Sequence, residues 1–104
     1  MNEKYQEWIQ FLEYEWAIPD GFLGKIRSGF FDENHGDKFA KFVSNIDFSD
    51  KKTIDRRLVA LLWYIPAFLQ WQKERVAEQG GDCISYDRFI NKIQEIIENV
   101  LGVP

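Results

Sequence analysis

The feature that most constrains the fold is an apolar run, Leu58 to Leu69, which holds neither a charge nor a side-chain amide. Its twelve residues are too few for a membrane-spanning helix, which needs roughly 20, and charged segments flank it on both sides. A short run of this kind is typical of a helix in the middle of a globular core. We therefore expect a helix that is buried nearly all round, with the rest of the chain packed against it.

A proline interrupts this helix. The helix is expected to start at Ser49 or Asp50, either of which can cap it, and to end near Gln79. Pro66 lies inside it, donates no backbone hydrogen bond, and clashes with the carbonyl group four residues earlier. We expect the helix to kink, or to break into two, between Leu62 and Pro66.

The other helices are predicted from apolar residues at spacings of three and four. No segment alternates with the period of two that strands show. The fold class is therefore all-α: a single domain, residues 1–104, built as a bundle of five to six helices around the buried, proline-kinked central helix. The spacings place the first helix at Glu3 to Trp16, a short second helix after an Asp20 cap, a third starting between Glu33 and Asp37 with Asp32 or Asn34 as its cap, and the last running from Asp82 or Ser85 to Gly102.

The charge balance limits the kinds of partner. The chain has a formal net charge of −4, which argues against a nucleic-acid binder, since such proteins gain affinity by neutralising phosphates with Lys and Arg. Ten of the seventeen acids lie in residues 1–50, against five bases. The chain is thus expected to favour a basic protein partner.

The cysteine count and the first residues indicate the compartment. Cys83 is the only cysteine, so the fold cannot depend on an intrachain disulfide. The opening sequence, MNEKYQEWIQF, lacks the continuous apolar segment and small-residue cleavage site of a signal peptide. We expect a cytoplasmic protein that does not engage a membrane.

The sequence offers little for catalysis. His35, the lone histidine, is expected to be an ordinary residue of an exposed polar loop, and Cys83 a buried or half-buried thiol without a histidine near it in sequence. The segment from Asp32 to Asp37 lacks the alternating acids and the final glutamate of a calcium loop. The prediction is a protein that is not an enzyme and carries no metal and no cofactor.

The first helix offers the best candidate for a binding surface. Opposite its apolar side, it mixes acids with aromatic residues, where a helix packed on one side should be polar. Acids steer a basic partner over a distance, and aromatic residues supply contact energy after it arrives. The candidates are Glu7 and Glu15 for steering and Phe11 and Tyr14 for contact. The alternative is that Phe11 and Tyr14 pack under residues 21–31.

In general character, the chain resembles a bacterial immunity protein. The pieces EWAIPDGFLGKIRSGFFDE and LLWYIPAFLQW are similar to the immunity partners of contact-dependent growth inhibition toxins. The resemblance assigns a role to no individual residue. It implies a non-enzymatic inhibitor, monomeric in a 1:1 complex, that occludes the active site of a cognate toxin, often a nuclease with a basic cleft.

Two other classes remain open. One is a small helical regulatory or adaptor protein that binds another protein, or that binds DNA through the basic cluster of Lys51, Lys52, Arg56 and Arg57. That cluster is more typical of a solvated helix end. The other class is an enzyme with an unfamiliar mechanism.

Overall fold

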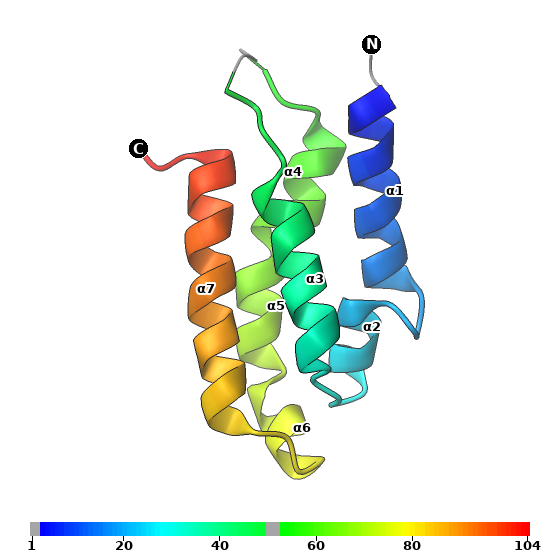
Figure 1. The fold of residues 1–104 in the computed structure, drawn as a ribbon, viewed down its shortest axis with the longest axis vertical. Coiled ribbons are helices and arrows are strands. Elements are labelled where there is room, and N and C mark those ends of the chain that lie inside the picture. The colour runs from blue at the N-terminus through cyan, green and yellow to red at the C-terminus, as the bar shows by residue number, and fades with distance from the viewer. Residues whose placement is uncertain (1–2, 50–52) are drawn as a thin grey trace.

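The computed structural model describes residues 3–49 and 53–104, and within these ranges the protein contains helices and no strand (Figure 1). The predicted all-α class is confirmed. The helical segments are α1 Glu3–Ala17, α2 Phe22–Arg27, α3 Glu33–Ser44, α4 Arg56–Trp63, α5 Ile65–Trp71, α6 Lys73–Glu78 and α7 Cys83–Leu101.

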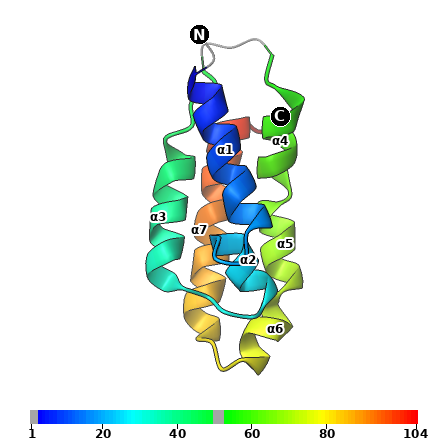
Figure 2. The same ribbon diagram turned by 90° about the vertical axis from the view of Figure 1, so that its right-hand side faces the viewer.

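The helices form four roughly parallel columns (Figures 1 and 2). The chain descends along α1, returns along α3, descends again through α4, α5 and α6, and returns along α7. The short α2 lies at the lower end of α1, and both chain ends lie at the opposite end of the bundle. Helix α7 packs against α3 and against each segment of the third column, while α1 packs against α2 and α4.

Aspartate caps begin two of the long helices as the sequence predicted. The Asp32 carboxylate accepts the backbone N–H of His35 at 3.1 Å and starts α3. The Asp82 carboxylate accepts the N–H groups of Ile84 and Ser85 and starts α7. These hydrogen bonds hold the pKa of each aspartate below its ordinary value, chiefly through the backbone N–H donors.

The expected Asp20 cap of α2 is wrong. The residue before α2 is Gly21, which has no side chain to donate or accept a bond. The first N–H of the helix, that of Phe22, is instead bound by the Glu15 carboxylate of α1 at 2.6 Å. The start of α2 can approach α1 this closely because Gly21 has no Cβ, which would collide with the carbonyl oxygens of Tyr14 and Glu15.

The predicted start of the fourth helix is also wrong. Ser49 lies in a turn where its N–H binds the Asp47 side chain, and Asp50 lies outside the described residues. The helix begins at Arg56 instead, because the Asp55 carboxylate accepts the N–H of Arg57 at 2.7 Å. Both Ser and Asp can cap a helix, so the sequence alone does not determine which of these residues starts it.

Pro66 breaks the helix, one of the two expected outcomes. Tyr64 separates α4 from α5, and Pro66 is the second residue of α5, where a helix does not use the backbone N–H. A second break at Gln72, which separates α5 from α6, was not expected. The segments α4, α5 and α6 follow one another in a single column. Counted as one interrupted helix beside α1, α2, α3 and α7, they give five helices, which is within the expected number.

The apolar run supplies much of the core, but only from one side. Leu61, Leu62, Ile65 and Phe68 are buried, as their spacing predicted. The expectation that the run is buried nearly all round is wrong, since the third column faces solvent on its other side. None of the described helices is long and apolar enough to cross a membrane.

Candidate functional site

Three large aromatic side chains are exposed on the solvent side of α4 and α5. Trp63 is 58% exposed, Tyr64 41% and Trp71 78%. Tyr64 and Trp71 are seven residues apart, about two helical turns, and so lie on the same side of the column. The Trp63 ring lies against the Tyr64 ring, with centroids 5.4 Å apart. We call these three residues the aromatic face.

Trp16 of α1 forms the edge of this face. Its ring stacks on Tyr64 with centroids 6.2 Å apart, and its other side meets Phe68 at 4.9 Å. Its indole N–H donates to the backbone carbonyl of Leu61 at 2.8 Å. Because packing and a hydrogen bond both hold Trp16, the edge of the aromatic face is fixed before any partner arrives.

A shallow groove opens between α1 and α4 beside Tyr64. Its walls are the two stacked rings and an arginine, and its volume is about 290 Å³, enough for a large side chain of a partner. The arginine, Arg57, is held in place by two contacts of 3.0 Å to the Glu13 carboxylate. The lining residues are Trp16, Arg57, Ala60, Leu61 and Tyr64.

Helices α4 and α5 carry no acid beside these aromatics. From Arg56 to Lys73 the sequence has three bases and no Asp or Glu. Arg57 is paired with Glu13, and Lys73 with Asp87 at 2.9 Å. Arg56 is exposed and makes no ion pair with the described residues. Within α4 and α5, the surface around the aromatic face therefore carries one unpaired positive charge, and the nearest exposed acids in sequence are Asp55 before α4 and Glu74 of α6.

The structure separates the residues predicted as a binding surface on α1. Glu7 and Tyr14 are exposed, as expected. Phe11 is not: its ring stacks on Phe42 of α3 at 3.6 Å and on Phe39 at 5.9 Å. It packs against α3 and not under residues 21–31, since α3 covers this side of α1. The predicted contact pair is thus reduced to Tyr14.

Glu15 is a second correction, because its side chain points inward. The residue is only 5% exposed, and one carboxylate oxygen binds both the N–H of Phe22 and the Nε2 atom of His35, the latter at 2.9 Å. A carboxylate that is enclosed and bonded in this way cannot steer a partner from a distance. Its role is to join α1 to α2 and α3.

His35 also differs from its prediction. It lies in the first turn of α3, not in an exposed loop, and its ring is largely buried. Its Nε2 faces Glu15, and its Nδ1 faces the Lys25 ammonium at 3.2 Å, which fits a neutral ring that donates from Nε2 and accepts at Nδ1. Lys25 in turn pairs with Asp32 at 3.0 Å.

This chain of polar groups, Glu15–His35–Lys25–Asp32, has a structural role. Both ring nitrogens of His35 are occupied by partners from the fold itself, which leaves neither for a substrate. The lysine also lowers the pKa of Asp32, after the larger effect of the His35 backbone N–H. The chain fastens α1, α2 and the start of α3 to one another.

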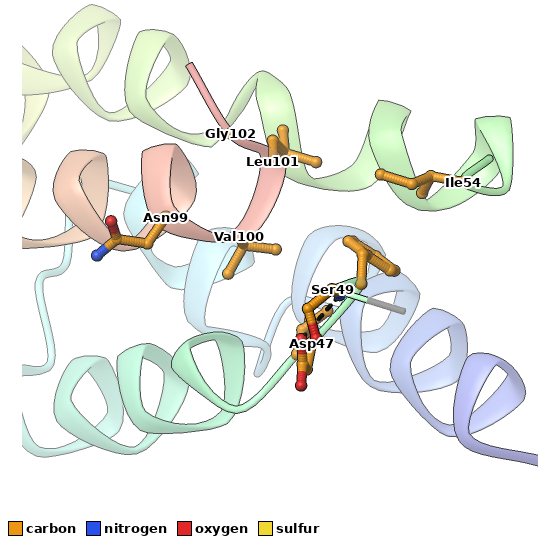
Figure 3. A pocket seen from close by; sticks show the side chains of 9 residues that line it. Asp47, Ser49, Ile54, Asn99, Val100, Leu101 and Gly102 are labelled. Carbon is orange, nitrogen blue, oxygen red and sulfur yellow. Dashed lines mark hydrogen bonds between the residues drawn. The ribbon is translucent and has the colours of Figure 1, made fainter. Parts of the chain in front are cut away.

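A second cavity lies at the other end of the molecule, beside the end of α7 (Figure 3). Its volume is about 270 Å³, and its walls come from residues 46–49, Ile54 and the last turn of α7. Asp47 is its one charged side chain, and the N–H of Ser49 already binds that carboxylate at 2.9 Å. The cavity therefore lacks the converging groups that define a ligand site.

Cys83 and the acidic segment near His35 offer no metal site. Cys83 is exposed at the start of α7, so the expected burial of its thiol is wrong. Among the described residues, no group of three or more His, Cys, Asp or Glu side chains is placed to hold a metal ion. Asp32 to Asp37 form a capped first turn of α3 in place of a loop.

In comparisons with known proteins, no protein-family model, curated protein or solved structure matches this chain.

The sequence expectation of a helix buried nearly all round leaves no room for the aromatic face. Within it, Leu58, Leu62 and Ile65 recur at spacings of three and four and share one side of a helix. The same projection puts Trp63, Tyr64 and Trp71 on the opposite side. That segregation of leucine and isoleucine from the large aromatics was the available signal.

Proposed function

We propose that this chain is a non-enzymatic protein-binding domain that acts, as a bacterial immunity protein does, by covering the active site of a cognate toxin. The proposal includes a cytoplasmic location and a monomer that forms a 1:1 complex. The observation that carries it is the aromatic face, because Trp and Tyr are enriched among the residues that supply most of the energy of protein interfaces.

The form of the aromatic face supports a specific partner. Trp16 braces Tyr64 from α1, and Glu13 braces Arg57, so the surface is already shaped without a partner. A preformed surface loses little conformational entropy on binding, which favours the tight binding that inhibition of a toxin requires.

The placement of the acids weakens the argument for a basic partner. Of the ten acids in residues 1–50, Glu15 is enclosed, and Glu13, Asp32 and Asp37 are paired with Arg57, Lys25 and Lys92. The exposed acids without such a pair lie in four separate segments: Glu7 in α1, Asp20 before α2, Glu33 in α3 and Asp47 after α3. The basic character of the toxin stays a prediction.

Protection against the toxin encoded by a neighbouring gene tests the proposal. Cells that produce the toxin domain together with wild-type protein should grow, and the two purified proteins should form a 1:1 complex. A Trp63→Ala/Trp71→Ala variant should lose protection and binding while it keeps its helical circular dichroism, since both side chains are exposed.

Two matched variants complete this test. Ile84→Ala removes an apolar side chain that is 71% exposed on α7 and is not part of the aromatic face, and this variant should protect like wild type. Tyr14→Ala tests the surface predicted on α1. If Tyr14→Ala abolished protection and the Trp63→Ala/Trp71→Ala variant did not, the binding surface would be that of α1.

The regulatory or adaptor alternative rests on the same aromatic face but on a different partner. It is favoured if no neighbouring toxin is bound, and if the protein binds another cellular protein through Trp63 and Trp71. If protection failed in every assay and the purified chain turned over a substrate, both the immunity function and the adaptor function would be contradicted.

A further inference from the structure

We infer that the partner places a segment on the aromatic face that is acidic at one end and apolar along the rest, with the acid at Arg56 and apolar side chains over Trp63, Tyr64 and Trp71. This inference rests on the proposed binding of a protein. It adds the surface, the orientation and the chemistry of the segment that is bound.

The order of residues along the third column supports this orientation. Arg56 precedes Trp63 by seven residues, and Arg57 precedes Tyr64 by seven and Trp71 by fourteen. Seven residues make about two helical turns and rise about 10 Å, so Arg56 lies on the side of Trp63, and Arg57 lies on the side of Tyr64 and Trp71. Both arginines are at the start of α4, at one end of the aromatic face.

Charge favours an acid at the Arg56 end. Arg56 is exposed and unpaired among the described residues, at the start of α4, where the helix dipole adds positive character. Arg57 is fixed by Glu13 beside the groove and still has donors that can meet a carboxylate. A basic segment would face Arg56 with no acid of α4 or α5 to balance it.

A second copy of the chain fits this surface poorly. Two aromatic faces brought together about a twofold axis would bury Arg56 of both copies, and α4 and α5 of either copy supply no acid to pair with it. A membrane of anionic lipids is also disfavoured, since one unpaired arginine supplies only about 1 kcal/mol of surface attraction. The shaped groove beside Tyr64 suits a side chain of a protein better than a fluid surface.

A random peptide library displayed on phage tests the inference with the full-length protein. The library is selected on wild-type protein after removal of phage that bind a Trp63→Ala/Trp71→Ala variant. The retained peptides should combine Asp or Glu at one end with aromatic or aliphatic residues, and a synthetic peptide from the set should bind more weakly as salt rises.

Variants then locate the peptide on the surface. Trp71→Ala and Arg56→Glu should each weaken its binding by about tenfold or more, as for truncation of a central interface residue or reversal of a recognised charge. Arg88→Glu makes the same charge change at an exposed site on α7 and should leave the affinity within about twofold. Wild-type circular dichroism in each variant shows that its fold is kept.

Several results would overturn the inference. In the selection, these are basic retained peptides, or no peptides that depend on the two tryptophans. In the binding assay, it is an unchanged affinity of the Arg56→Glu variant for the peptide. For the other occupants, it is a dimer of the free protein that Trp71→Ala dissociates, or binding to phosphatidylserine vesicles that Trp71→Ala removes. If the toxin still bound the Trp63→Ala/Trp71→Ala and Arg56→Glu variants, the proposed function would stand and this surface would not.

Discussion

Glu15 connects three helices through a single carboxylate. The oxygen that binds the Phe22 N–H replaces the side-chain cap that Gly21 cannot supply, and the same oxygen meets His35 on α3. A carboxylate in so enclosed a position is stable only when donors surround it, because an unpaired buried charge is costly. Its surroundings thus explain both its burial and the position of the lone histidine.

The first prediction concerns this residue. Glu15→Ala should lower the free energy of unfolding by about 1.5 to 3 kcal/mol, because it removes hydrogen bonds to a charged group and leaves the Phe22 N–H without its partner. Chemical denaturation followed by circular dichroism measures the change. Glu7→Ala, on the exposed side of the same helix, should change it by about 0.5 kcal/mol or less. Equal effects of the two substitutions would show that the carboxylate of Glu15 is not a structural link.

At the scale of the element, the third column packs into the core on one side and exposes large aromatic residues on the other. Leu58, Leu62 and Ile65 face the core, whereas Trp63 and Tyr64 face solvent, although all five belong to one apolar run. The break at Tyr64 puts Pro66 in the first turn of α5, where the helix uses no backbone N–H, and the Tyr64 ring stacks on Trp16. The side that stabilises the fold and the side proposed to bind can therefore be tested at adjacent positions.

The second prediction compares Leu62 with Trp63. Leu62→Ala should destabilise the protein by about 2 to 5 kcal/mol, because a fully buried leucine leaves a cavity. Trp63→Ala should change stability by about 1 kcal/mol or less, since more than half of that side chain is exposed. Thermal or denaturant unfolding of both variants gives the comparison. A larger loss in Trp63→Ala would mean that this tryptophan serves the fold more than a partner.

Local periodicity explains how much of the fold could be predicted from the sequence. Apolar spacings of three and four indicated α1, α2, α3 and α7, and the apolar run identified the main source of the core. The start of α4 could not be chosen, because several polar residues before Arg56 are suitable caps. The link between Glu15 and His35 joins residues twenty apart and depends on how α1 packs on α3, which no local pattern contains.

The same limit of local patterns explains which residues of the candidate site could be predicted from the sequence. Exposure of Glu7 and Tyr14 followed from their side of α1, and Phe11 and Glu15 differed because α2 and α3 cover the adjoining side. A helical projection shows which residues share a side of a helix, but it does not show how much of that side a neighbouring helix will cover. The aromatic face needed only that projection applied to the apolar run.

At the scale of the whole molecule, the net charge of the chain and the unpaired charge beside the aromatic face have opposite signs. The chain carries −4 overall, yet beside the aromatic face Arg56 makes no ion pair with the described residues, and α4 and α5 hold no acid. Net charge acts while partners approach, and local charge acts once they touch. A partner with an acidic segment would thus be repelled weakly at long range and held at short range.

The last prediction follows from this opposition of signs. Association with the toxin should be slow for a charged pair, about 10⁵ to 10⁶ M⁻¹s⁻¹, because electrostatic steering adds little to the neutral rate. Added salt should leave that on-rate nearly unchanged and should raise the off-rate instead, since it screens the contact at Arg56. Surface plasmon resonance over a range of salt concentrations separates the two rates. Glu7→Lys is the control, and it should leave the on-rate within about twofold. An on-rate well above this range that falls steeply with salt and drops in Glu7→Lys would instead support a basic toxin steered by the acids of the N-terminal half, because only attraction at long range gives that combination.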